Sequence, residues 1–514
     1  MKKKFLLPLL LIPMLISCSQ ENLPLDFISY DNDFAYIKTK YNVKEDNYYQ
    51  KDNLGEVNLN EKYPGMNGVT NIDGLSSLYE SMNRHILNSD DEVHLLVVPI
   101  GFADSDKSQY DAKRTLIQNA FFGQPETTKY QSVASYYNAS SYGHAKIVGE
   151  VTNWVTYPKG MNDIPDSNVS KDNIISYTIG KLLEAEFDFS PYCSLDERYI
   201  DGVYFIYDRM YEKNNSDSIF WATTEHKSSP LGKIVNYSWS SFYFMQDDGD
   251  DILTSHYVRS NTFIHETGHL FGLVDYYNTN SHYRYQPTGF MDMMDYNLGD
   301  HCSFSKYLLG WTTPKVVTGS GDITIRSFTK FGDFILVPAG KFNNSPFSEY
   351  LLVEYFTPVE LNNSRTFPSY SYRDAEGNER VFSYPTTYGV RVYHIDARLG
   401  YKAVRSPSPY AYIDSEESKI ASKYVANTTS IDFYNSNEAK DISSQTLIHL
   451  LESSGNNTFV NGEAANNQTL FRRGTTFGED VFKDFTFNNG QKLDYSFSIS
   501  TLNQDSVTIS FTKK

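Results

Sequence analysis

The residue types most able to do chemistry lie close together between His265 and Asp275, in the stretch His-Glu-Thr-Gly-His-Leu-Phe-Gly-Leu-Val-Asp. On an α-helix, residues four apart lie one above the other, so His265 and His269 can present both imidazoles to one metal ion. Glu266 follows the first histidine directly, which places its carboxylate beside a metal-bound water rather than on the metal. The pattern therefore predicts a metal site with a neighbouring general base.

The residues after the second histidine complete the predicted site. Gly272 allows the chain to leave the helix through a left-handed turn that a side chain would oppose. Asp275 then supplies a carboxylate oxygen, a ligand type that suits Zn²⁺. Three protein ligands leave a fourth position open for water, so we expect hydrolytic chemistry in which zinc lowers the pKa of that water to about 7 and Glu266 accepts its proton. Histidines on an ordinary amphipathic helix are the alternative, but the added Gly and Asp make the pattern much more specific.

Length and composition bound the class of protein. The chain of 514 residues is too long for one compact core, and the length favours two to four domains. A hydrophobic content of 40% is too high for a disordered protein. The formal net charge of −18 argues against nucleic acid as a partner and against electrostatic docking to anionic lipid. We interpret this charge as a contribution to solubility.

The N-terminus has the layout of an export signal. Three lysines at 2–4 precede an apolar run at 5–16, which is too short for a stable membrane span. The run ends in Leu-Ile-Ser-Cys18, which resembles a bacterial lipobox, so we expect a signal peptide at 1–17 and a lipid on Cys18. The mature protein would then lie in the cell envelope or at the cell surface, attached to a bacterial membrane only through this anchor. An ordinary secreted protein with an incidental cysteine is the alternative.

Two questions stay open at the level of the sequence. If Cys18 carries lipid, Cys193 and Cys302 are the remaining cysteines, and they could form one disulfide or stay as two buried thiols. Residues 18–90 are polar and weakly periodic, and we interpret them as a tether or a pro-segment.

The remaining chain divides into two regions by its hydrophobic pattern. Residues 91–315 alternate apolar runs with helical patterns, which predicts an α/β sandwich that contains the His265 helix, starting near Ser260. Residues 316–514 contain short alternating segments and turns, which predicts antiparallel β structure, expected to be a β-sandwich. The predicted elements of the first region are strands at 93–100, 146–151 and 203–207 and helices around 115–121, 132–138 and 172–187, the last with Asp172 as N-cap. Those of the second region are strands at 323–325, 334–337, 351–355, 390–395 and within 496–511.

The motif from His265 to Tyr277 resembles that of the immune inhibitor A group of bacterial metallopeptidases. Shorter stretches are similar to segments of the same family, over roughly 93–477, whereas residues 19–90 match nothing specific. These stretches are 132–137, 141–143, 149–151, 188–192, 290–294, 305–311, 352–355 and 389–396.

The resemblance implies a metzincin-type catalytic domain, with a twisted sheet and an active-site helix. It implies that His265, His269 and Asp275 bind zinc, that Glu266 is general base and acid, and that Met294 forms the floor under the metal. Tyr296, two residues after Met294, would correspond to a tyrosine that stabilises the tetrahedral intermediate in some metzincins; a structural surface tyrosine is the alternative. The implied function is a secreted, lipid-anchored zinc endopeptidase acting on extracellular proteins.

Calcium is a further cofactor that the sequence suggests without assigning. Family members often carry an Asp- and Gly-rich loop before the strand at 203–207, but here 196–202 keeps only some of those oxygens. A second cluster has carboxylates of the type that hard cations prefer, although a solvated acidic loop is the alternative. It consists of Asp247, Asp248, Asp250 and Asp251 around Gly249.

Two other functions compete with this prediction. The immunoglobulin A-cleaving metallopeptidases carry a related His-Glu-x-Gly-His motif, but the short spacing from Gly272 to Asp275 and the downstream Met294 favour the first family. A surface adhesin or glycan-binding lipoprotein, whose β region binds a host ligand, belongs to a different class. The intact set of catalytic residue types argues against a protein that only binds.

Overall fold

The computed structural model shows a mixed α/β protein with several β-sheets and a β-rich C-terminal region. The predicted signal peptide at 1–17, Cys18 and the acidic cluster at 247–251 lie outside the described residues. The described residues are 48–50, 74–81, 84–211, 215, 218–246, 252–254, 257–277, 286–340, 342, 346–367, 369–373, 378–397, 446–488 and 490–514.

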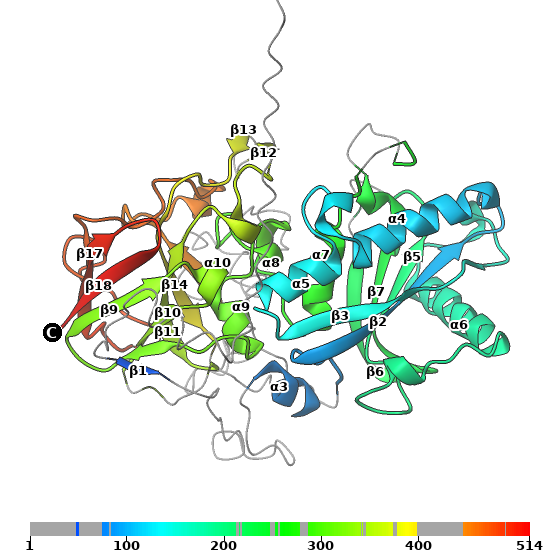
Figure 1. The fold of residues 1–514 in the computed structure, drawn as a ribbon, viewed down its shortest axis with the longest axis horizontal. Helices are drawn as coiled ribbons and strands as arrows, with labels where there is room; N and C mark the ends of the chain where they lie inside the picture. Colours follow the sequence, from blue (N-terminus) through cyan, green and yellow to red (C-terminus); the bar gives the residue numbers. More distant parts are fainter. Residues whose placement is uncertain are drawn as a thin grey trace, which may run out of the picture.

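The first region is a twisted sheet with helices on both faces (Figure 1). Its strands lie in the order β3-β2-β5-β7-β6, with β4 beside β2, and every pair is parallel except β6 with β7. The edge strand β6 is therefore antiparallel to the rest of the sheet. The strands are β2 (Asp91–Gly101), β3 (Ala145–Val151), β4 (Val155–Thr156), β5 (Val203–Tyr207), β6 (Thr223–Leu231) and β7 (Ile234–Ser241). The helices are α3 (Leu75–Ser81), α4 (Tyr110–Phe122), α5 (Val133–Ser140), α6 (Asn168–Glu184) and α7 (Asn261–Leu270).

The alternation of side chains along β2 explains the two helical layers. Val93, Leu95 and Val97 point into the hydrophobic cluster that contains residues of α4, α5 and α7. Leu96 and Val98 point to the opposite face, where they join residues of α6. A central strand buried on both faces requires a continuous apolar run, which is the pattern that predicted this strand.

The second region is a sandwich of two sheets. A six-stranded sheet has the order β1-β8-β10-β11-β14-β15, and a four-stranded sheet has the order β16-β17-β18-β9. Side chains from both sheets form one hydrophobic cluster between them, as the alternating pattern predicts. The strands are β1 (Tyr48–Gln50), β8 (Lys315–Val317), β9 (Gly321–Arg326), β10 (Phe334–Pro338), β11 (Glu349–Phe356), β14 (Gly389–Asp396), β15 (Ile448–Leu451), β16 (Thr476–Phe477), β17 (Tyr495–Leu502) and β18 (Ser506–Lys513). A separate hairpin of β12 (Tyr370–Arg373) and β13 (Glu379–Phe382) and the short helices α8 (Met293–Tyr296), α9 (Ser303–Leu308) and α10 (Phe328–Phe331) complete this part.

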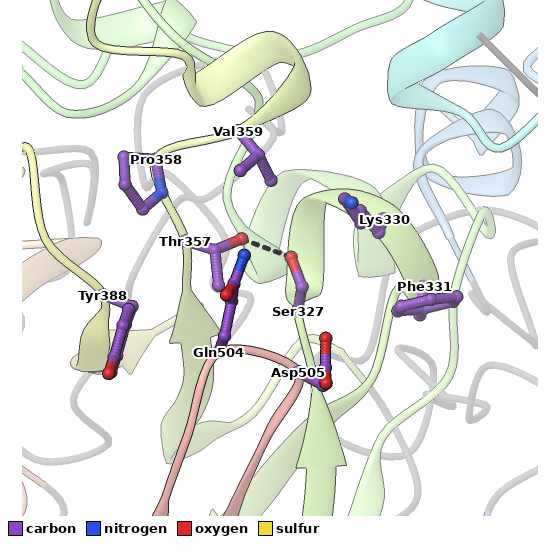
Figure 2. Close-up of a pocket in the computed structure, with 9 residues that line it drawn as sticks. All are labelled: Ser327, Lys330, Phe331, Thr357, Pro358, Val359, Tyr388, Gln504 and Asp505. Carbon is purple, nitrogen blue, oxygen red and sulfur yellow. Dashed lines mark hydrogen bonds between the residues drawn. The ribbon is translucent and has the colours of Figure 1, made fainter. Parts of the chain in front are cut away.

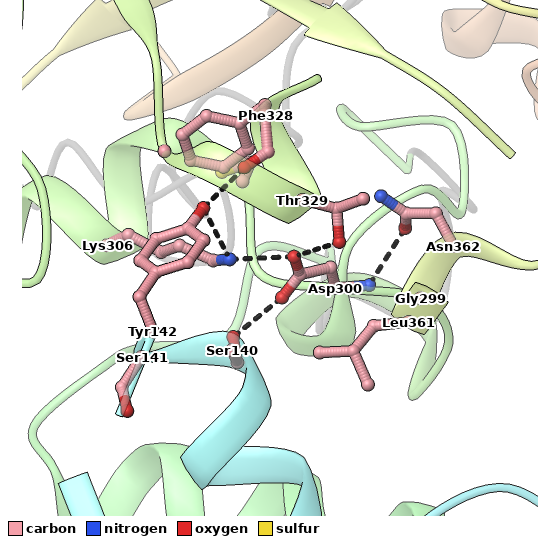
Figure 3. Close-up of polar contacts among 12 residues, drawn as sticks. Ser140, Ser141, Tyr142, Gly299, Asp300, Lys306, Phe328, Thr329, Leu361 and Asn362 are labelled. Atoms are coloured by element: carbon pink, nitrogen blue, oxygen red, sulfur yellow. Dashed lines mark hydrogen bonds and ion pairs between the residues drawn. The ribbon is translucent and has the colours of Figure 1, made fainter. Parts of the chain in front are cut away.

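A buried polar joint connects the two regions around Asp300 (Figure 3). The Asp300 carboxylate accepts hydrogen bonds from Ser140 of α5 (2.6 Å) and Thr329 of α10 (2.7 Å), and it pairs with the Lys306 ammonium of α9 (2.7 Å). Both charged side chains are fully buried. One hydrophobic cluster also contains buried side chains of both regions, with Leu75 and Leu470 as its first and last members along the chain. The two regions predicted from the sequence therefore share one core.

The helix predicted at 172–187 is real, but its predicted ends are wrong. α6 starts at Asn168, because the Ser167 hydroxyl accepts the Ser170 backbone N–H (3.3 Å) and caps the helix one turn before Asp172. Asp172 instead lies within the helix and forms an ion pair with Lys227 of β6 (3.1 Å).

The two cysteines in the described part of the chain are separate thiols. Cys193 belongs to the cluster that packs on α6, and Cys302 belongs to the cluster on the other face of the sheet. Burial raises the pKa of each thiol above its ordinary value. The sequence had left a disulfide or two buried thiols open, and the structure has two buried thiols.

None of the helices in the described ranges combines the length and the apolar character needed to span a bilayer.

Candidate metal centre

Helix α7 brings the predicted histidines to the interior of the molecule. Phe263, Ile264 and Leu270 pack into the core, and they hold the helix against the sheet. The helix ends in a left-handed turn at Gly272, where φ is +91°, as the glycine predicts. A Cβ at this position would lie 3.0 Å from the Tyr79 ring, so close packing also favours glycine there. The turn directs the following residues back toward the helix.

His265, His269 and Asp275 form a compact group of donor atoms, all within 4.8 Å of one another. Asp275 Oδ1 lies 2.9 Å from His265 Nε2 and 3.1 Å from His269 Nε2. No other group of three or more His, Cys, Asp or Glu side chains comes this close in the ranges that the structure describes. The spacing along the chain thus becomes a spatial cluster.

Backbone carbonyls orient both imidazoles. His265 Nδ1 lies 2.9 Å from the Met293 carbonyl, and His269 Nδ1 lies 2.8 Å from the Leu273 carbonyl. Because a carbonyl only accepts, each Nδ1 carries the proton and each neutral ring keeps its lone pair on Nε2. Second contacts of this kind fix the tautomer of histidine ligands in metal sites.

The donor set and its spacing fit Zn²⁺. Two nitrogens and one carboxylate oxygen are a known ligand combination for catalytic zinc. Two donors on one tetrahedral ion, at bond lengths of about 2.1 Å, lie about 3.4 Å apart. The observed separations of 2.9 Å and 3.1 Å between Asp275 Oδ1 and the two Nε2 atoms would need to open only slightly. The donor types and these two separations therefore fit the ion.

The charges of this group depend on one another. Burial alone would lower the pKa of His269, but the Asp275 carboxylate outweighs it and raises that pKa to about 9. Burial alone would raise the pKa of Asp275, but the neighbouring imidazolium and hydrogen bonds hold it well below its usual range. Without a metal the group is an ion pair, so metal binding at neutral pH must displace a proton from His269.

The remaining predicted site residues lie around this group. Glu266 is 6% exposed, and its Oε2 accepts a hydrogen bond from the Thr224 hydroxyl of β6 (2.7 Å). Met294 is fully buried under α7, and a Cβ added to Gly268 would lie 2.5 Å from its Sδ atom. Met294 therefore packs against α7 between the two histidines.

Tyr296 lies in a different environment from its neighbour Met294. Its ring packs against Phe290 (4.3 Å between centroids) and against Tyr370 of β12 (6.3 Å). The Tyr277 ring instead stacks on His265, with 6.1 Å between ring centroids. Burial and the nearby Asp275 carboxylate raise the pKa of Tyr277 well above its usual value. The ring contact with His265 is thus made by Tyr277, whereas the ring contacts of Tyr296 are with Phe290 and Tyr370.

The loop at 196–202 does not gather oxygens for calcium. The Asp201 carboxylate accepts the backbone N–H groups of Ser194 (2.7 Å) and Leu195 (3.0 Å), and Asp196 pairs with Arg198 (2.6 Å). These carboxylates have donors of the chain as partners, so the predicted calcium receives no support at this loop.

A cavity of about 240 Å³ lies away from the predicted site, between loops at one end of the sandwich (Figure 2). Its walls include Phe331, Pro358, Val359, Tyr388 and Gln504. No site residue predicted from the sequence lines it.

Sequence comparisons find no matching family model and no matching curated protein. Matches among solved structures include wild-type OgpA from Akkermansia muciniphila, with 12% sequence identity, coverage of 61% of this chain and 84% of that chain, and a TM-score of 0.25. A likeness this low carries no argument about fold or function. The evidence for a function therefore comes from the geometry of the site.

Proposed function

We propose that this protein is a zinc-dependent endopeptidase of the immune inhibitor A type that acts on extracellular proteins. The observation that carries the proposal is the convergence of His265 Nε2, His269 Nε2 and Asp275 Oδ1 beside the carboxylate of Glu266. We further propose that export and a lipid on Cys18 place the enzyme at the outer surface of a bacterial membrane.

In this proposal three side chains bind the metal and a fourth transfers the proton during peptide hydrolysis. Zinc bound by His265, His269 and Asp275 would polarise the scissile carbonyl and lower the pKa of a water molecule. Glu266 accepts the proton of the attacking water and returns it to the leaving amine. The carbonyls of Met293 and Leu273 keep the two imidazoles in the tautomer that presents Nε2.

The experiment compares wild type, Glu266→Gln and His269→Ala in a chain that starts at residue 19. Zinc is measured by elemental analysis and turnover by cleavage of labelled casein, with and without a chelator. We expect wild type to bind about one zinc and to lose cleavage with the chelator. Glu266→Gln should keep the zinc and lose about 10²- to 10⁴-fold in turnover, whereas His269→Ala should lose the zinc itself.

His94→Ala is the matched control, because His94 is a partly exposed histidine that pairs with Glu92 on β2, outside the proposed site. It should behave as wild type. Cleavage that survives in Glu266→Gln would contradict the proposal. Zinc bound without cleavage in wild type would instead point to a narrow substrate or to latency. Absence of zinc from wild type would favour the adhesin hypothesis, in which the β region binds a ligand.

A further inference from the structure

The edge strand β6 supports helix α7 with polar side chains on one face. Thr224 and His226 are two residues apart on the strand, so their side chains point to the same face, which is the face toward the helix. The Thr224 hydroxyl lies 2.7 Å from Glu266 Oε2 and 3.1 Å from the Glu266 carbonyl, and His226 Nε2 lies 2.9 Å from the His269 carbonyl. β6 therefore contacts the helix at the general base and at one of the ligands.

Thr224 has a second hydroxyl beside it. Ser238 of β7 is its direct partner across the antiparallel pair, and the two oxygen atoms are 2.6 Å apart. Tyr204 of β5 is in turn the register partner of Ser238, and its hydroxyl donates to the Phe263 carbonyl of α7 (2.8 Å). Three neighbouring strands thus place hydroxyl groups in one row beneath the helix.

The direction of the Thr224–Ser238 hydrogen bond follows from proton counting. A threonine hydroxyl has one proton, and neither oxygen of Glu266 named here can donate when the carboxylate is charged. If Thr224 donated to Ser238, it would turn a lone pair toward a carboxylate that is 6% exposed, which is unfavourable. Ser238 must therefore donate to Thr224, and Thr224 donates to Glu266.

We infer that Thr224 is a positioning residue for Glu266 and that Ser238 fixes the direction of its hydroxyl group. The Thr224 hydroxyl donates a hydrogen bond to Oε2 of Glu266. No described residue hydrogen-bonds to Oε1 of Glu266, and this second oxygen would accept the proton of the reacting water. The inference rests on the proposed function of Glu266 as general base. It adds Thr224 and Ser238 to the residues that act in the proposed site, and both lie outside the His265–Asp275 motif.

The test uses Thr224→Val, which keeps the shape and removes the hydroxyl, and Thr224→Ser, which keeps the hydroxyl. With labelled casein, Thr224→Val should lose about 10- to 100-fold in kcat, the loss expected for one hydrogen bond to a charged group. Its KM should stay within about twofold and its zinc content should not change, because the bond acts on the base rather than on the ligands. Thr224→Ser should stay within about threefold of wild type in kcat, and Ser238→Ala should fall between the two.

Thr223→Val is the control for a Thr-to-Val change on β6, because neighbouring side chains of a strand point to opposite faces. The inference is overturned if Thr224→Val turns over casein within twofold of Thr223→Val. It is also overturned if Thr224→Ser is as impaired as Thr224→Val, since packing would then explain the loss.

A cycle of thermal melts on metal-free protein tests the contact without any activity. The decrease in Tm caused by Thr224→Val should be clearly smaller in a Glu266→Ala background, where the partner is missing. Equal decreases in both backgrounds would overturn the inference. A wild type that does not cleave casein, combined with a positive cycle, would refute the proposed function while the hydrogen bond stands.

Discussion

Gly268 shows how little space surrounds the residues of the proposed site. It lies in α7 between His265 and His269, and a Cβ there would come within 2.5 Å of Met294 Sδ and 3.2 Å of the Tyr137 hydroxyl. The glycine lets the methionine pack directly against the helix that carries both histidines. The glycine of the motif therefore has a steric role that its sequence position alone does not reveal.

We expect Gly268→Ala to lower the free energy of unfolding by about 1–3 kcal/mol, because an extra methyl overpacks a filled space. Gly180→Ala is the matched control, since Gly180 lies in α6 with no atom near its added Cβ. That change should raise stability by about 0.5–1 kcal/mol. Urea unfolding of both variants checks the prediction, which fails if Gly268→Ala is as stable as Gly180→Ala.

At the same scale, the clustering of the two histidines beside Glu266 could be predicted, but the residues that contact this group from elsewhere in the chain could not. His265, Glu266 and His269 follow from the period of one helix, which is a local property. Thr224 precedes Glu266 by many residues, and it meets the carboxylate only because β6 runs antiparallel at the edge of the sheet. Tyr277 was part of the quoted motif, but only the course of the chain after Gly272 brings its ring to His265.

At the scale of elements, residues 74–81 and 84–90, within the predicted tether or pro-segment, pack against the turn after α7. The Tyr79 hydroxyl donates to the Gly272 carbonyl (3.2 Å), and the Leu87 N–H donates to the Leu270 carbonyl (2.8 Å). Leu75 and Leu78 are buried in the shared core. The C-terminal part of the predicted tether or pro-segment thus contacts the turn that leads from α7 to Asp275.

We expect a chain that starts at residue 91 to melt at a lower temperature and to bind zinc more weakly than one that starts at residue 74. The first chain loses the contacts that Tyr79 and Leu87 make with the turn after α7, whereas the second retains them. Thermal melts and zinc titration with a competing chelator provide the comparison. Equal affinity in the two chains would show that the turn holds its shape without the segment.

The helices and strands could be predicted where the sequence pattern that specifies them is local. The buried strand β2 and the alternating strands of the sandwich follow from apolar periodicity, and the structure has both. The start of α6 was misplaced because both Ser167 and Asp172 are residue types that can cap a helix, and the cap hydrogen bond is made by Ser167. The hairpin of β12 and β13 was not predicted. It packs on Phe290 through Tyr372 and Phe382, and such long-range contacts leave no local signal.

At the scale of the whole molecule, the sandwich supports the predicted active site directly. The Arg391 guanidinium of β14 donates to the Met291 carbonyl (3.2 Å), two residues before helix α8, and forms an ion pair with Glu354 of β11. A Glu354 oxygen also accepts the Ser303 N–H at the start of α9 (2.8 Å). Arg391 and Glu354 are fully buried, so each depends on the other to compensate its charge.

Arg391→Met should therefore destabilise the protein by about 3–5 kcal/mol, because it leaves the Glu354 charge buried without its partner. It should also weaken zinc binding, since Met291 precedes the segment whose Met293 carbonyl orients His265. The control is Arg198→Met, which removes an ion pair at the surface with Asp196 and should leave the unfolding midpoint nearly unchanged. Similar unfolding midpoints for the two variants would contradict the assigned role of Arg391.

The shared core also limits how such a protein can change over generations. Recombination exchanges folding units most easily where few contacts cross the boundary. Here one hydrophobic cluster contains buried side chains of both regions, and the ion pair of Asp300 and Lys306 is sealed between the regions. A foreign sandwich joined after residue 315 would meet an incomplete interior, so the two regions must be inherited, and altered, together.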